Sequence, residues 1–133
     1  MIPPLNDDGY LPAGIHHSTL EEIAARFGVE SELRRVQMES LHWVVDLARR
    51  AGVARIIVNG SFVTDKLEPN DVDCALLADA DFPRDAAAAE ELLAGLPFVE
   101  LHILGLDRFD RFVQTIFGSD RALIPKGVIE ILL

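Results

Sequence analysis

The sequence predicts a single α/β domain in which helices pack on a small mixed β-sheet. Two observations support this fold class. Short β-branched or alternating apolar runs recur along the chain, and segments whose apolar residues have helical spacing lie between them. The chain has 133 residues, and 50% of them are hydrophobic, which is enough for one domain with a core of its own.

The N-terminal segment is expected to differ from the rest of the chain. Residues 1–17 are rich in Pro, Gly, Asn and Asp, which predicts an extended arm with turns, and the domain itself is expected over residues 18–133. His16 and His17 have no acidic or cysteine partner at a spacing useful for metal binding, so we interpret them as loop residues.

Two helices are predicted next. The sequence Ser-Thr-Leu-Glu at 18–21 fits a capping box and predicts a short helix that ends at Gly28. A longer helix is expected over Ser31–Ala51, because apolar residues follow one side of it and Gly52 suits the position after a helix. Arg34 and Arg35 are assigned to its solvated face, and a contact with a phosphate or a partner stays open as the alternative.

Four strands and two further helices complete the predicted domain. The strands are expected at residues 53–59, 71–77, 98–104 and 127–133. Asp85 is expected to cap a helix that runs to Ala94 before Gly95. The helix over Asp107–Phe117 is predicted from apolar residues spaced three and four apart.

The most informative segment is RIIVNGSFVTDKLEPNDVDCALL, residues 55–77. Asp71 and Asp73 are two residues apart on a predicted strand, so both side chains project from one face. Two adjacent carboxylates repel each other unless a cation lies between them. Gly60 and Ser61 form a turn just upstream, which suits the close approach of a phosphate to backbone N–H groups. The alternatives are a solvated edge strand for the aspartates and a strand-ending turn with a helix-capping serine.

Other residues are candidates for the same site. Glu100 is the candidate third carboxylate because it falls on the next predicted strand, and a solvated sheet face explains it equally well. His102 shares the face of Glu100 and is interpreted as a solvated neighbour. Lys66 and Lys126 are candidate contacts for a triphosphate, although most surface lysines have no such role. Cys74 is expected to face the core and to be inert.

Composition limits the partners of the chain. The formal net charge is -10, and no cluster of Lys and Arg is present, so direct DNA binding is not expected. A bound nucleotide and a basic protein partner are both compatible with this charge. No apolar run is long enough to span a membrane, and the N-terminus lacks the pattern of a signal peptide. Cys74 is the only cysteine, which favours the reducing cytoplasm.

The ordered set of these residues resembles the nucleotidyltransferase superfamily that includes DNA polymerase beta. In that family an apolar strand ends in Gly-Ser or Gly-Gly, an acid–apolar–acid triplet follows on the next strand, and a third acid lies on a later strand. The pattern is met in order by Gly60, Ser61, Asp71, Asp73 and Glu100. The short length is similar to that of minimal nucleotidyltransferases found as antitoxins. The two ends of the chain resemble a smaller group of uncharacterised bacterial proteins within that superfamily.

The resemblance implies a function and a set of roles. Mg²⁺ would be bound by three carboxylates, those of Asp71, Asp73 and Glu100. The phosphates of a nucleoside triphosphate would be held at the turn, by Gly60 and Ser61, with Lys66 as a further candidate. The chain would transfer a nucleoside monophosphate to a protein or RNA, as the antitoxin of a toxin–antitoxin pair. The alternative is a catalytically inactive copy of the fold that masks a protein partner by binding, and an oligomer is compatible with both.

Overall fold

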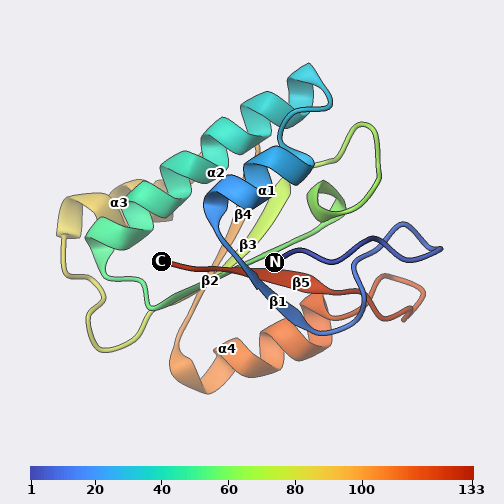
Figure 1. Cartoon of the computed structure of the whole chain (residues 1–133). Helices are drawn as coiled ribbons and strands as arrows, with labels where there is room; N and C mark the ends of the chain where they lie inside the picture. The colour runs from blue at the N-terminus through green and yellow to red at the C-terminus, as the bar shows by residue number, and fades with distance from the viewer.

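Helices cover both faces of one five-stranded mixed sheet in the computed structural model, which describes residues 1–133 (Figure 1). The strands lie in the order β1-β5-β2-β3-β4. Their bounds are β1 (Ile15–Ser18), β2 (Arg55–Asn59), β3 (Val72–Leu77), β4 (Val99–Leu104) and β5 (Val128–Ile131). The helices are α1 (Leu20–Phe27), α2 (Glu32–Ala51), α3 (Ala86–Ala94) and α4 (Leu106–Phe112), with a 3-10 turn η1 (Ser61–Val63) and a π-helical turn η2 (Val113–Phe117). The predicted α/β class is confirmed.

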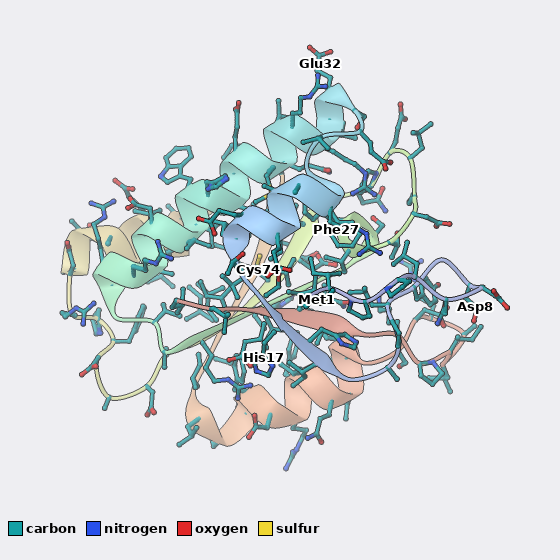
Figure 2. The ribbon with its side chains drawn as sticks, viewed as in Figure 1. Met1, Asp8, His17, Phe27, Glu32 and Cys74 are labelled. Atoms are coloured by element: carbon teal, nitrogen blue, oxygen red, sulfur yellow. The ribbon has the colours of Figure 1, made fainter.

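The two faces of the sheet bury two separate apolar clusters. Helices α1, α2 and α3 pack on one face, and α4 packs on the other, below the sheet in the view of Figure 1. Successive residues of one strand belong to different clusters. Val58 of β2 lies in the larger cluster, and Ile57 lies in the smaller cluster with Phe109 of α4. Cys74 is buried in the larger cluster, as the sequence predicts, and burial raises the pKa of its thiol (Figure 2).

Strand pairing brings three polar residues into one row on the face that α4 covers. Because β2 pairs antiparallel with β3 and β3 pairs parallel with β4, Asn59, Asp73 and Glu100 are direct cross-strand neighbours. The other side of β2 pairs antiparallel with β5, and β1 is parallel to β5. The polar row lies where β2 ends and where β3 and β4 begin, next to the turn at Gly60.

Local signals predicted most helices correctly. Ser31 caps α2, its hydroxyl accepting a hydrogen bond from the Arg34 N–H at 3.1 Å, and Gly52 ends the helix with a φ of 82°. Asp85 caps α3, its carboxylate accepting from the N–H groups of Ala87 and Ala88. These hydrogen bonds join residues within one turn of each other, which is why the sequence alone predicts them.

The N-terminal segment differs from the predicted extended arm at its end. Residues Ile15–Ser18 form β1, so the boundary expected at residue 17 falls inside a strand. The prediction that the two histidines lie in a loop was wrong. The His17 imidazole lies 3.4 Å from the Glu130 carboxylate of β5, on the side of the sheet that faces α4 (Figure 2). The partner strand β5 is at the other end of the chain, and local sequence patterns do not reveal such a pairing.

Two helix ends also differ from the prediction. Thr19, and not Ser18, caps α1 by accepting a hydrogen bond from the Glu22 N–H at 3.1 Å. The helix α4 ends at Phe112, and the rest of the predicted helix winds as the wider turn η2. No helix of the fold combines the length and the apolar character needed to cross a membrane.

Arg34 is buried, so its assignment to a solvated helix face was wrong. Only 2% of the residue is exposed. Its guanidinium donates hydrogen bonds to the carbonyls of Phe27 and Phe62 at 3.0 and 2.7 Å, and to those of Thr64 and Lys66 at 3.0 and 2.6 Å. Burial lowers the pKa of Arg34, with Glu30 and Asp65 opposing the shift through their negative charge. The side chain therefore ties α1 and α2 to the loop that follows β2.

Gln37 holds the other end of the same loop. It lies one turn after Arg34 on α2, and its side-chain amide donates to the carbonyls of Pro69, at 3.1 Å, and Asn70. The loop of residues 61–71 thus receives hydrogen bonds from two successive turns of one helix. This loop connects the Gly60 turn with β3, so α2 fixes the relative positions of Gly60 and Asp73.

Replacing Arg34 by alanine should destabilise the fold strongly. Four carbonyls, three of them buried, would lose their donor, and we expect the free energy of unfolding to fall by about 3–5 kcal/mol. Urea unfolding followed by circular dichroism measures this change. The matched control is Arg35→Ala, whose exposed side chain donates one hydrogen bond, to the Val29 carbonyl, and should change stability by less than about 0.5 kcal/mol. Equal losses in the two variants would contradict the assigned role of Arg34.

Candidate functional site

A hollow of about 350 Å³ opens on the side of the sheet that faces α4, at the end where the polar row lies. The strands β2, β3 and β4 line it together with one continuous stretch of chain from η2 to the start of β5. The sheet contributes Asn59, Asp73, Glu100 and His102, the turn η2 contributes Ile116 and Phe117, and the loop before β5 contributes Ser119, Asp120, Arg121 and Lys126. Polar and charged side chains dominate this lining, in contrast to the apolar clusters of the core.

Asp73 and Glu100 form an acid pair inside the hollow. They occupy paired positions on the parallel strands β3 and β4. Burial and a hydrogen bond shared with Glu100 raise the pKa of Asp73 to about 7, and the negative charges of Glu100 and Asp71 act in the same direction. Lys126 opposes this shift. A proton or a cation is therefore needed to relieve the repulsion between these carboxylates near neutral pH.

Asp71 does not join the acid pair in the hollow. It lies immediately before β3, is exposed, and is absent from the lining of the hollow. Its charge still reaches Asp73, whose pKa it raises. The chain contains no group of three or more His, Cys, Asp or Glu side chains arranged to hold a metal ion together. Of the three predicted carboxylates, the structure brings two together.

Gly60 is required by the position of Asp73. Its φ of 88° lies in a region that side-chain-bearing residues rarely adopt. A Cβ atom at this position would lie 2.5 Å from the Oδ2 atom of Asp73. The backbone at the end of β2 and the Asp73 carboxylate are therefore in direct contact, and only glycine permits this approach.

Ser61 and Lys66 lie outside the lining of the hollow. The Ser61 hydroxyl accepts a hydrogen bond from the Asn70 N–H at 2.9 Å, which closes the loop between β2 and β3. The Lys66 side chain is exposed, and its carbonyl accepts a hydrogen bond from Arg34. In this arrangement Ser61 braces the loop, and the structure does not bring Lys66 to the acid pair.

Asn59 is a site residue that the sequence reasoning missed. It is 3% exposed, it lines the hollow beside Asp73, and its side-chain oxygen has no hydrogen-bond partner. Buried polar atoms are almost always paired, so the Asn59 oxygen in this polar hollow is available to accept a hydrogen bond from water or to bind a ligand. The available signal was an asparagine directly before Gly60, in a strand of otherwise apolar residues after Arg55.

Lys126 and His102 complete the electrostatic surroundings of the acid pair. Burial lowers the pKa of Lys126, while Asp73 and Asp120 raise it, so the lysine is a half-buried cation facing the acids. The His102 imidazole packs against the rings of Phe112 and Phe117, at centroid distances of 4.8 and 5.9 Å. Its Nε2 atom lies 3.8 Å from the Glu100 carboxylate. His102 is thus a packed member of the site and more than a solvated neighbour.

Comparison with known families identifies the family of this chain. A family model described as a family of unknown function, DUF6932, matches residues 3–132. The chain belongs to DUF6932. The matched residues include every strand and helix of the fold, so the acid pair, Asn59 and Lys126 all lie within the DUF6932 region. Searches of curated proteins and of solved structures gave no match.

The acid pair makes a testable contribution to the pH dependence of stability. The pKa of Asp73 is about 7 in the folded chain against an ordinary value of 3.8, so the folded chain binds an additional proton between these values. The stability contributed by this group is therefore present at low pH and is lost as pH rises from about 4 to about 7.

Replacing Asp73 by asparagine should remove this loss. We expect Asp73→Asn to be more stable than the wild-type chain at pH 8 and to show a flatter stability profile between pH 4 and 7, because the acid repulsion is absent. Thermal unfolding across this pH range, in EDTA, measures the profile. Asp79→Asn, an exposed residue just after the far end of β3, is the control and should retain the wild-type profile. A wild-type profile in Asp73→Asn would contradict the raised pKa.

Proposed function

We propose that this chain is a Mg²⁺-dependent nucleotidyltransferase, which moves a nucleoside monophosphate from a nucleoside triphosphate to a protein or RNA acceptor. One observation carries the proposal. The Asp73–Glu100 pair lies on neighbouring strands, in direct contact with the Gly60 turn, inside a polar hollow. Acid residues beside a close backbone approach are the parts that phosphoryl transfer requires.

The residues of the hollow fit a Mg²⁺ ion by their chemistry. Carboxylate and amide oxygens are the protein ligands that Mg²⁺ prefers, and the site offers those of Asp73 and Glu100 together with the unpaired oxygen of Asn59. Burial and the neighbouring Glu100 raise the pKa of Asp73, so ionising its carboxyl group is costly, and a bound divalent cation would stabilise the ionised form. When bound, the ion would supply charge stabilisation to the phosphate oxygens.

The chain itself supplies positioning, positive charge and a proton acceptor. The family resemblance implies that Gly60 and Ser61 hold the phosphates, and since the Asp73 carboxylate lies against the Gly60 backbone, a phosphate held at this turn would lie beside Asp73. Lys126 and Arg121 line the hollow as cations, and we assign the triphosphate contact to them; the sequence had suggested Lys126 and Lys66 for this contact. Glu100, which is exposed at the rim, can accept the proton of the acceptor hydroxyl. The oxygen of that hydroxyl then bonds to the α-phosphorus as pyrophosphate leaves.

A catalytically inactive module is the second candidate function. It is favoured by the position of Asp71, which lies outside the lining of the hollow, so the acid set of the superfamily pattern is not gathered. Such a module would mask a protein partner by contact, as an antitoxin masks its toxin, and the net charge of -10 suits a basic partner. For both candidates we propose a cytoplasmic location, where the single buried thiol of Cys74 stays reduced.

Calorimetric titration distinguishes the two candidates. ATP, GTP, CTP and UTP are each titrated into the purified chain with and without Mg²⁺. A working site binds at least one of them only with Mg²⁺, and Asp73→Asn should weaken that binding at least about tenfold, because the carboxylate that anchors the ion is absent. The matched control Asp79→Asn removes one charge after the far end of the same strand and should bind as the wild-type chain does.

The result of these titrations decides between a nucleotide-binding site and an inactive module. Binding that is lost in Asp73→Asn and kept in Asp79→Asn supports nucleotidyl transfer and justifies a search for the acceptor. Absence of binding for all four nucleotides would contradict the transferase proposal and favour the inactive module. Binding that is unchanged in Asp73→Asn would place the nucleotide elsewhere on the chain.

A further inference from the structure

The strand β4 forms one edge of the sheet, and its outer side has no hydrogen-bonded partner. It pairs with β3 only. The strand has six residues, from Val99 to Leu104, and contains no proline. An uncovered edge of this kind is a template for pairing with another strand. At the opposite edge of the sheet, β1 is shorter, and the N-terminal ammonium group donates a hydrogen bond to the His17 carbonyl.

The backbone groups at the β4 edge are regularly arranged for such pairing. The carbonyls of Phe98 and Leu104 accept hydrogen bonds from the β3 side, from the N–H groups of Val72 and Ala78, each at 2.8 Å. Successive residues of a strand direct their backbone groups to opposite edges, so the even-numbered residues of β4 face β3. The N–H and C=O groups of the odd-numbered residues, Val99, Leu101 and Ile103, therefore point outward.

The apolar side chains along this edge are only partly covered. A groove of about 280 Å³ lies between the end of α3 and β4, and it is lined by Leu92, Leu93, Gly95, Val99, Leu101 and Ile103. Leu93 is 68% exposed. Covering this groove would remove apolar surface from water, which favours association. The edge thus offers both free backbone groups and an apolar surface.

The charges on β4 favour a second copy of this chain as the occupant. In an antiparallel self-pair, the outward-facing residues must pair with one another. If Leu101 pairs with its own copy, Glu100 lies opposite His102 of the partner subunit. If the centre of the pairing moves to residue 100, Glu100 lies opposite the partner's Glu100. If it moves to residue 102, His102 lies opposite the partner's His102. Only the register in which Leu101 pairs with its own copy places a carboxylate opposite an imidazole donor.

We propose that this chain forms a two-fold symmetric dimer by antiparallel pairing of β4 with β4, centred on Leu101. The two sheets then become one continuous sheet. The Glu100–His102 pairs are the ones without mutual backbone hydrogen bonds, and side chains lie closest in such pairs. Because Glu100 also lines the hollow with Asp73, His102 of the partner subunit would lie next to each hollow. The dimer does not depend on nucleotidyl transfer.

Sedimentation velocity on the full chain tests whether β4 is the interface. The wild-type chain should be a dimer at concentrations of about 100 µM, and Leu101→Pro should be a monomer, since proline removes an outward N–H and no bond to β3 is lost. Ile15→Pro is the matched control at the opposite edge and should remain a dimer. Circular dichroism verifies that both variants fold. A monomeric wild-type chain, or a dimeric folded Leu101→Pro, would overturn the proposal; a monomer would leave the edge to a strand from another protein.

Cysteine cross-linking tests the register independently. Residues paired with their own copies have Cα atoms about 5.5 Å apart, a distance that a disulfide can bridge. Leu101→Cys should therefore give a covalent dimer on mild oxidation. Val99→Cys should not, because Val99 lies opposite Ile103 of the partner subunit. Cys74 is buried and does not interfere. Cross-linking through Val99→Cys, or none through Leu101→Cys, would overturn the proposed register.

A charge exchange tests the Glu100–His102 pairing. His102→Glu places two carboxylates opposite each other in both symmetric pairs, and dimerisation should weaken about tenfold. The double variant Glu100→His with His102→Glu restores an acid opposite an imidazole, and its dimer affinity should return toward that of the wild-type chain. Equal weakening in the single and the double variant, with both folded, would show that these residues do not face each other.

Discussion

The hydrogen bonds of the buried Arg34 guanidinium are the constraint on which the rest of the site depends. Its donors bind four backbone carbonyls from the end of α1 and from the loop after β2. A buried cation is tolerable only when its donors are satisfied, and here backbone dipoles satisfy them in place of a carboxylate. Gln37 binds the far end of the same loop. The loop is therefore held at both ends by α2, next to the Gly60 turn that lies against Asp73.

The acid pair is held in place despite the repulsion between its members. Asp73 and Glu100 face each other because strand register puts them at paired positions, and the Gly60 turn lies directly against the Asp73 carboxylate. Lys126 offsets part of the charge, and the oxygen of Asn59 stays without a partner. Groups that destabilise the folded chain and yet converge in one hollow are typical of functional sites.

The two ends of the chain cooperate to form the wall of the hollow. Tyr10 donates a hydrogen bond to Asp120 at 2.8 Å, and Asp120 also accepts from the N–H groups of Ala122 and Ile124. The Gly127 N–H donates to the Leu11 carbonyl, so the N-terminal segment supports the loop that carries Lys126. Asp120 and Lys126 line the same hollow as the acid pair on β3 and β4.

The sequence by itself determined the α/β class and the ends of α2 and α3, because helix caps and turn glycines act within a few residues. It did not determine that Ile15–Ser18 would be a strand, that Arg34 would be buried, or that Asn59 would lie unpaired beside Asp73. Those features depend on which distant strands and loops meet. Tertiary structure alone decided them, since burial and cross-strand partners are set by packing between segments that the sequence keeps far apart.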